Sequence, residues 1–168
     1  EKNFMSLFNA INKMAEKYDM PILYSCHPRS RNRLAASGFQ LDPRVIQHEP
    51  LGFHDYNCLQ MNAFAVVSDS GTLPEESSFF TSVGHPFPAI CIRTSTERPE
   101  AIDKGDFIIA GIDEKSLLQA VDTAVELCRD GQHGIPVPDY VDENVSTKVV
   151  KIVQSYVGIV NKMVWRKF

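Results

Sequence analysis

Residues 66–76, with the sequence VVSDSGTLPEE, constrain this chain more than any other segment. The apolar residues at its start predict a buried strand, and the small polar residues after them predict a turn that opens a helix. At such a junction the first N–H groups of the helix lack partners within the helix, and the helix dipole adds partial positive charge. The segment therefore predicts an anion site, with Ser70 and Gly71 against a phosphate group.

Glu76 lies further along the same predicted helix. A carboxylate at this position can reach the hydroxyl groups of a ribose, which favours a nucleotide over a bare phosphate. Many α/β proteins end a strand in a Ser-Gly turn that binds nothing, so a purely structural turn stays open as the alternative.

Short apolar runs alternate with helical patterns along most of the chain. Apolar residues at three- and four-residue spacing predict helices at 4–18, 55–61 and 116–128, with more polar helical stretches at 31–37 and from residue 72. The predicted strands are 22–24, 45–46, 64–67, 89–92 and 107–110. Parallel strands need helical crossover connections, so this order predicts an α/β fold, a Rossmann-like parallel sheet with helices on both faces.

Polar loops follow three of the predicted strands, and two of these loops carry basic side chains. His27 and Arg29 follow the first strand, and Arg93 and Arg98 follow the fourth. Ligands bind beyond the carboxyl ends of strands in such sheets, so these side chains are expected to meet the turn at Ser70 around a diphosphate. Two alternatives stay open: His27 as a strand-end residue whose ring is satisfied by the backbone, and Arg93 pairing with a nearby carboxylate.

Composition narrows the function classes. The chain has 168 residues, 43% of them hydrophobic, and a formal net charge of −4, so it has no overall basic field for nucleic acid. No apolar run approaches the ~18 residues of a membrane span. The four cysteines form no CxxC pair, and the five histidines show no metal-ligand spacing, so we expect reduced thiols, a cytoplasmic location and no metal.

Several motifs together resemble the UDP-N-acetylglucosamine 2-epimerase family. They are His27-Pro28-Arg29, Glu49-Pro50-Leu51 with Tyr56, Asp69-Ser70-Gly71 with Glu75-Glu76, and Thr96-Glu97-Arg98-Pro99-Glu100 with Gly105. The resemblance implies the C-terminal half of an enzyme with two Rossmann-like domains, arranged as in GT-B glycosyltransferases. It departs from the usual pattern at Thr72-Leu73-Pro74, which resembles the capsule and O-antigen branch that forms UDP-N-acetyl-L-fucosamine.

The resemblance also implies roles for individual residues. Ser70 and Gly71 would bind the diphosphate of a UDP-sugar, Glu76 the ribose and Tyr56 the region of the uracil. His27 would be catalytic, and Arg29 and Arg98 would counter the departing phosphate. The implied isomerase reaction eliminates UDP across C1–C2 and adds it back with C2 inverted, with no cofactor.

The expected division is a UDP-binding domain at 1–143 and a C-terminal helix at 144–168 that packs on an N-terminal domain outside this sequence. We therefore expect no epimerase turnover from this polypeptide alone, and a homodimer is possible for the whole enzyme. Two other functions stay open: the nucleotide-binding half of a GT-B glycosyltransferase, and a non-catalytic module that binds nucleotide sugars.

Overall fold

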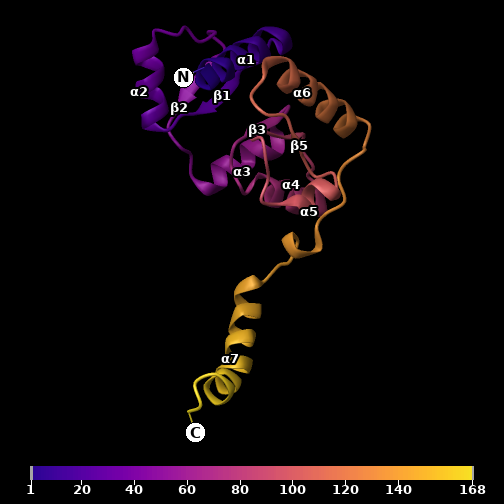
Figure 1. The fold of residues 1–168 in the computed structure, drawn as a ribbon. Coiled ribbons are helices and arrows are strands. Elements are labelled where there is room, and N and C mark those ends of the chain that lie inside the picture. The colour runs from indigo at the N-terminus through magenta and orange to yellow at the C-terminus, as the bar shows by residue number, and fades with distance from the viewer. Residues whose placement is uncertain (1, 168) are drawn as a thin grey trace.

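The computed structural model describes residues 2–167, and helices alternate with strands up to residue 129, after which the elements are helical (Figure 1). The elements are α1 (Lys2–Tyr18), β1 (Ile22–Ser25), α2 (Pro28–Ser37), β2 (Val45–His48), α3 (Phe53–Asn62), β3 (Val66–Ser68), α4 (Leu73–Ser82), β4 (Ala89–Cys91), α5 (Pro99–Asp103), β5 (Ile108–Ile109), α6 (Glu114–Arg129), the short 3₁₀ helix η1 (Pro138–Tyr140) and α7 (Val145–Met163).

All strand pairs are parallel, which confirms the predicted fold class. The hydrogen-bonded ladders form two sheets, β1-β2 and β3-β4-β5, where the sequence predicted one. Ile22 pairs with Val45 in the first sheet, and Ile90 lies between Val67 and Ile108 in the second. Ile22, Val67 and Ile108 pack against the same apolar cluster, so both sheets share one core.

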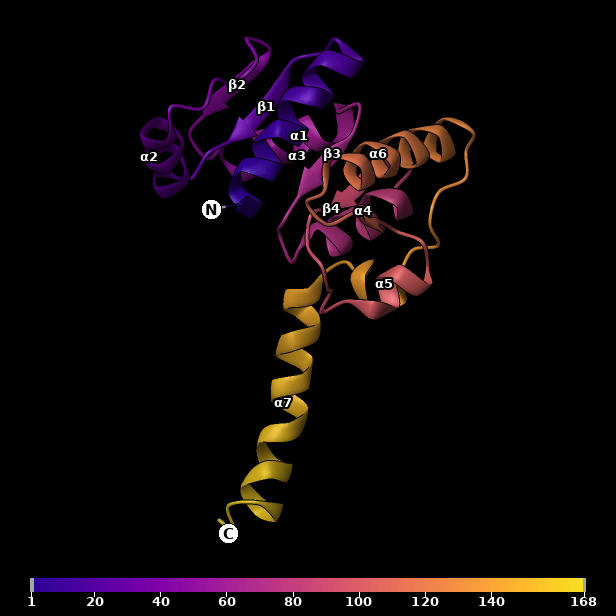
Figure 2. The same cartoon turned by 45° about the horizontal axis from the view of Figure 1, so that its top comes forward.

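That shared core lies between the strands and the helices α1 and α6, which run side by side (Figure 2). Phe8 of α1 and Leu117 of α6 are fully buried there, together with Ile90 of β4. Both helices present apolar residues at three- and four-residue spacing, so each buries one face against the strands.

A second apolar cluster lies on the opposite face of β4. Ala89 and Cys91 point into it, because side chains alternate between the two faces of a strand. Leu73, at the start of α4, is fully buried in this cluster. Its burial fixes the beginning of α4, and with it the turn that precedes the helix.

The structure refines several predicted bounds. Helix α2 begins at Pro28, before the predicted residue 31, because His27 caps it and proline suits the first helical position. Strand β3 covers residues 66–68, later than the predicted 64–67. Helix α5 was not predicted, because five residues are too few to show a helical period.

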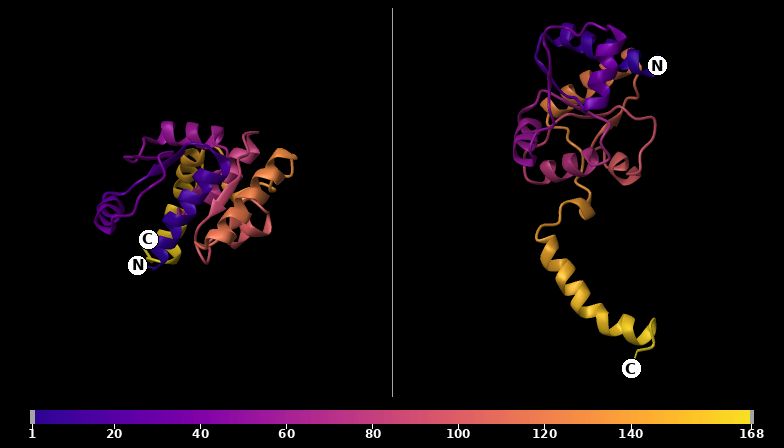
Figure 3. Two further views of the ribbon diagram at one scale, coloured as in Figure 1. Left: turned by 90° about the horizontal axis from the view of Figure 1, so that it is seen from above. Right: turned by 90° about the vertical axis from the view of Figure 1, so that its left-hand side faces the viewer.

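Helix α7 stands apart from the rest of the chain, as two further views make plain (Figure 3). None of its residues is buried, and Val149, Val153 and Tyr156 are each more than half exposed. Within residues 2–167, no helix combines the length and the apolar character that a membrane span requires.

Candidate functional site

The turn between β3 and α4 is closed by its own hydroxyl groups. Ser68 Oγ accepts a hydrogen bond from the Ser70 N–H at 3.0 Å, and Ser70 Oγ accepts one from the Thr72 N–H at 3.2 Å. Pro74 has no N–H to offer. Among the described residues, the N–H groups of Gly71, Leu73 and Glu75 donate to no other group, so they are the free donors at this turn, and those of Gly71 and Leu73 lie closest to Ser70 in the chain.

Arg93 brings positive charge to the turn. Its Nε donates to the Asp69 carbonyl oxygen at 2.6 Å. A Cβ atom on Gly71 would lie 4.0 Å from Nη1 of Arg93, so the guanidinium group reaches the position where a side chain at residue 71 would begin. Arg93 therefore lies beside the Ser70-Gly71 turn, held by a backbone carbonyl and not by a carboxylate, and its contact with a phosphate stays a prediction.

The Glu76 carboxylate is held on both sides. Thr72 Oγ1 donates to its Oε1 at 2.8 Å, and Gln60 Nε2 donates to its Oε2 at 2.6 Å. The same Nε2 donates to the Tyr56 hydroxyl at 3.0 Å. Tyr56 and Glu76, which the sequence assigned to one nucleoside, are therefore joined through Gln60.

The Tyr56 side chain is neutral near neutral pH. Burial is the main cause that raises its pKa to about 12, and the nearby negative charge of Glu76 adds to the effect. A protonated phenol that accepts from Gln60 keeps its own O–H free to donate to another group.

Arg98 is engaged with α4. Its Nε and Nη2 both lie 2.8 Å from Oε1 of Glu75, and its Nη1 donates to the Glu97 carbonyl oxygen at 3.2 Å. The carboxylate of Glu75 raises the pKa of Arg98, chiefly through this hydrogen bond. Much of the guanidinium group is thus occupied, and a role for Arg98 at a phosphate stays a prediction.

His27 lies two residues beyond the end of β1, where it caps α2. Its Nδ1 accepts a hydrogen bond from the Arg29 N–H at 3.3 Å. In this arrangement the proton of the neutral ring is on Nε2, and the His27 side chain is exposed. Arg29 is also exposed, in the first turn of α2.

The parallel pairing of β3 and β4 brings the loops that follow them to one edge of their sheet, and the loop with His27 follows a strand of the other sheet. His27 follows β1, Asp69 follows β3, and Arg93 follows β4, all at the carboxyl ends of strands. No hydrogen bond or ion pair joins His27 or Arg29 to the Ser70 turn among the described residues.

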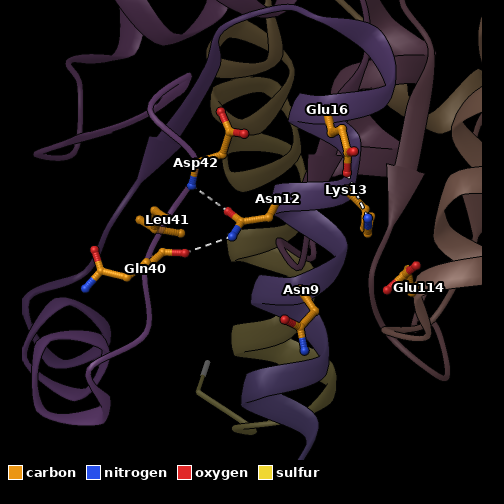
Figure 4. A pocket seen from close by; sticks show the side chains of 8 residues that line it. All are labelled: Asn9, Asn12, Lys13, Glu16, Gln40, Leu41, Asp42 and Glu114. Atoms are coloured by element: carbon orange, nitrogen blue, oxygen red, sulfur yellow. Dashed lines mark hydrogen bonds and ion pairs between the residues drawn. The ribbon is translucent and has the colours of Figure 1, made fainter.

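Figure 4 shows a pocket of about 390 Å³ that lies elsewhere, beside α1. Asn12 donates to the Gln40 carbonyl oxygen and accepts from the Asp42 N–H, both at 2.8 Å. These bonds fasten the loop before β2 onto α1. The pocket lies at the amino end of β2, away from the edge that carries Ser70 and Arg93.

Sequence reasoning missed Gln60 and Thr72 as partners of Glu76. Thr72 precedes Glu76 by four residues, and Gln60 follows Tyr56 by four, so each pair shares a helical face. This spacing is a signal that was present in the sequence, but nothing in it indicated that α3 and α4 lie close enough for Gln60 to reach Glu76.

Comparisons with known proteins agree on one family. A family model described as UDP-N-acetylglucosamine 2-epimerase matches residues 1–154. A UDP-N-acetylglucosamine 2-epimerase from Methanococcus maripaludis is 31% identical over 121 residues, which cover 69% of this chain and 31% of that protein. The chain thus spans about a third of the length of this curated relative.

Solved structures share the fold. A structure of UDP-N-acetylglucosamine 2-epimerase from Rickettsia bellii has a TM-score of 0.86 and 36% identity, covering 99% of this chain and 45% of that one. A Methanocaldococcus jannaschii UDP-GlcNAc 2-epimerase in complex with UDP-GlcNAc and UDP has a TM-score of 0.74 and 24% identity, covering 93% and 41%. With the family model matching most of its residues, the chain belongs to the UDP-N-acetylglucosamine 2-epimerase family.

Proposed function

We propose that this chain forms the UDP-binding half of a UDP-N-acetylhexosamine 2-epimerase. The observation that carries the proposal is the cluster at the carboxyl ends of β3 and β4. There Arg93 lies against the Ser70-Gly71 turn, and Glu76 is fixed by Thr72 and Gln60. Arg93 and the Ser70-Gly71 turn suit a diphosphate, and the fixed Glu76 carboxylate suits the hydroxyl groups of a ribose.

The reaction we propose is elimination of UDP across C1–C2 of the sugar, which leaves a 2-acetamidoglycal, followed by addition of UDP with C2 inverted. Negative charge grows on the phosphate oxygen as the C1–O bond breaks. The N–H groups of Gly71 and Leu73 and the guanidinium group of Arg93 stabilise that charge in the transition state more than in the ground state. His27, which is exposed beyond the end of β1, is our candidate for a catalytic residue, and Arg29 is our candidate for a second phosphate contact.

Titration with UDP tests the binding half of this proposal. By calorimetry, we expect Glu76→Ala to weaken UDP binding about tenfold or more, because a hydrogen bond to a charged group contributes about 1.5–3 kcal/mol. Ser70→Ala should weaken binding of both UDP and inorganic diphosphate. Glu143→Gln, at an exposed site before α7, is the control. Unchanged UDP affinity in both site variants would overturn the proposal.

We also propose that the chain alone has no epimerase turnover. Proton removal and return at C2 need acid and base groups on opposite faces of the sugar ring. Glu75 is paired with Arg98, and Glu76 is held by Thr72 and Gln60, so neither is available as the base. Exchange of the C2 hydrogen of a UDP-sugar for deuterium in the presence of this polypeptide would contradict this expectation.

For the division of the enzyme, we propose that residues 1–143 form the UDP-binding domain and that α7 packs on the preceding half of a longer polypeptide. The exposed apolar stripe of Val149, Val153 and Tyr156 on α7 supports this, since such a stripe is stabilised by burial. Amide hydrogen exchange tests the idea. We expect exchange in α7 to slow when the preceding half is present, and equal rates with and without it would refute the packing.

For the substrate, we propose the class used by the capsule and O-antigen branch, in which UDP-2-acetamido-2,6-dideoxy-L-talose becomes UDP-N-acetyl-L-fucosamine. The departure at Thr72-Leu73-Pro74 supports this branch. NMR analysis of products from the longer polypeptide, offered either this substrate or UDP-N-acetylglucosamine, tests it. Turnover of UDP-N-acetylglucosamine alone would overturn the branch assignment and leave the UDP site unaffected.

A further inference from the structure

Gln60 is a buried amide in the middle of a polar chain. It is 3% exposed, on the inner face of α3, and its Nε2 lies within hydrogen-bond distance of both the Tyr56 hydroxyl and the Glu76 carboxylate. This series of hydrogen bonds runs from α3 to α4, so Gln60 joins the two helices that carry the predicted nucleoside contacts.

The orientation of the amide follows from its partners. A carboxylate only accepts hydrogen bonds, so the atom of Gln60 that lies 2.6 Å from Glu76 Oε2 must be the nitrogen. Thr72 holds the other oxygen of Glu76 at 2.8 Å. Because each oxygen accepts a hydrogen bond from a neutral donor, the orientation of the Glu76 carboxylate is fixed before a ligand binds.

We propose that Gln60 is a positioning residue for the nucleoside. It orients Glu76 toward the ribose hydroxyl groups and fixes the Tyr56 ring beside the base. The inference rests on the proposed UDP-binding function and adds to it a residue that does not itself contact the phosphates. Its effect is therefore specific to the nucleoside part of the ligand.

A second observation separates this role from simple packing. The Oε1 atom of Gln60 is buried and has no hydrogen-bond partner among the described residues. An apolar side chain at this position would fill the same space without burying an unpaired acceptor, so packing of α3 alone does not account for an amide here.

The test compares UDP with 2′,3′-dideoxy-UDP and with inorganic diphosphate, using calorimetry on the full chain. The unaltered chain should bind UDP about tenfold or more tightly than the dideoxy ligand, because Glu76 contributes a charge-assisted hydrogen bond. In Gln60→Met that preference should fall to about threefold or less, while the affinity for inorganic diphosphate changes by less than about twofold. Gln47→Met, at an exposed position of β2, is the control and should keep the full preference.

A second variant keeps the test decisive if methionine disturbs the fold. Gln60→Leu removes the same amide with a different apolar shape, so it should also lose the preference for UDP over the dideoxy ligand. If either folded variant retains the preference, the positioning role is wrong. If the unaltered chain binds no UDP at all, the proposed function fails. If the unaltered chain binds UDP but does not prefer it to the dideoxy ligand, only the inference about Gln60 and Glu76 is overturned.

Discussion

Replacing Asp106 with asparagine should make the protein more stable at pH 8. Asp106 is 6% exposed, and neither of its carboxylate oxygens has a hydrogen-bond partner among the described residues. Its backbone packs tightly against Gly134, where an added Cβ would lie 2.7 Å from the Asp106 Cα. The side chain therefore has little room to turn toward water.

The sign of the pH dependence follows from the pKa. Burial raises the pKa of Asp106 above its ordinary value, and a contact with Ser78 opposes this only in part. The ionised form of Asp106 is thus disfavoured in the folded state. The contribution of the protonated side chain to stability is fully present below the unfolded-state pKa of about 3.9. That contribution is lost as the pH rises through the folded-state pKa.

Asparagine has the same shape but no charge to bury. Leaving a buried polar group unsatisfied costs about 1–3 kcal/mol, and more when the group is charged. We therefore expect Asp106→Asn to raise the free energy of unfolding by about 1–3 kcal/mol at pH 8, with the difference shrinking toward zero near pH 4.

Urea unfolding at the two pH values measures this difference, with the midpoint and the slope fitted separately. Asp103→Asn is the matched control, because Asp103 is exposed in α5 and its replacement should have little effect at either pH. An asparagine variant that is no more stable than the unaltered protein at pH 8 would refute the reasoning about a buried, unpaired carboxylate.

Three further predictions concern packing and charge. Gly134→Ala should lower the free energy of unfolding by about 1–3 kcal/mol, because its Cβ would meet backbone atoms of Asp106. Gly158→Ala in α7 is the control, since its Cβ would meet nothing within 4 Å, and it should not destabilise the protein. Urea unfolding compares the two variants. Arg93→Met should weaken UDP and inorganic diphosphate about equally, by roughly tenfold in calorimetry, because Arg93 reaches only the turn. Arg98→Met should weaken UDP less than Arg93→Met does, since Glu75 already occupies that guanidinium group, and an equal or larger loss would contradict this.

Most of the fold was predictable because its signals are local. The apolar spacing of α1 and α6 and the short apolar strands mark the core, and the strand order then requires parallel pairing. The split into two sheets was not predictable, because hydrogen bonding between neighbouring strands depends on small displacements that leave no trace in the apolar pattern. The bounds of α2 depended on a cap and a proline, which are local signals that the helical period alone does not use.

The turn at Ser70 shows how much of a site the sequence can predict. The strand, the small residues and the following helix were evident, and the structure places Arg93 beside them as expected. Which N–H groups remain free was not evident, because it depends on the hydroxyl groups of Ser68 and Ser70 turning back on the turn itself. The same serines that mark an anion site thus reduce the number of donors that it offers.

The difference between Arg93 and Arg98 has the same origin. Both follow β4 in the sequence, and nothing in their neighbours distinguishes an arginine that faces the turn from one that pairs with a carboxylate. The distinction arises from α4, where Glu75 and Glu76 point in different directions from adjacent positions. Glu75 pairs with Arg98, so Arg93 is the arginine that lies at the turn, and Glu76 accepts a hydrogen bond from Gln60. The arrangement of charges at the site therefore depends on the orientation of the first turn of α4. The burial of Leu73 in the second apolar cluster fixes that orientation.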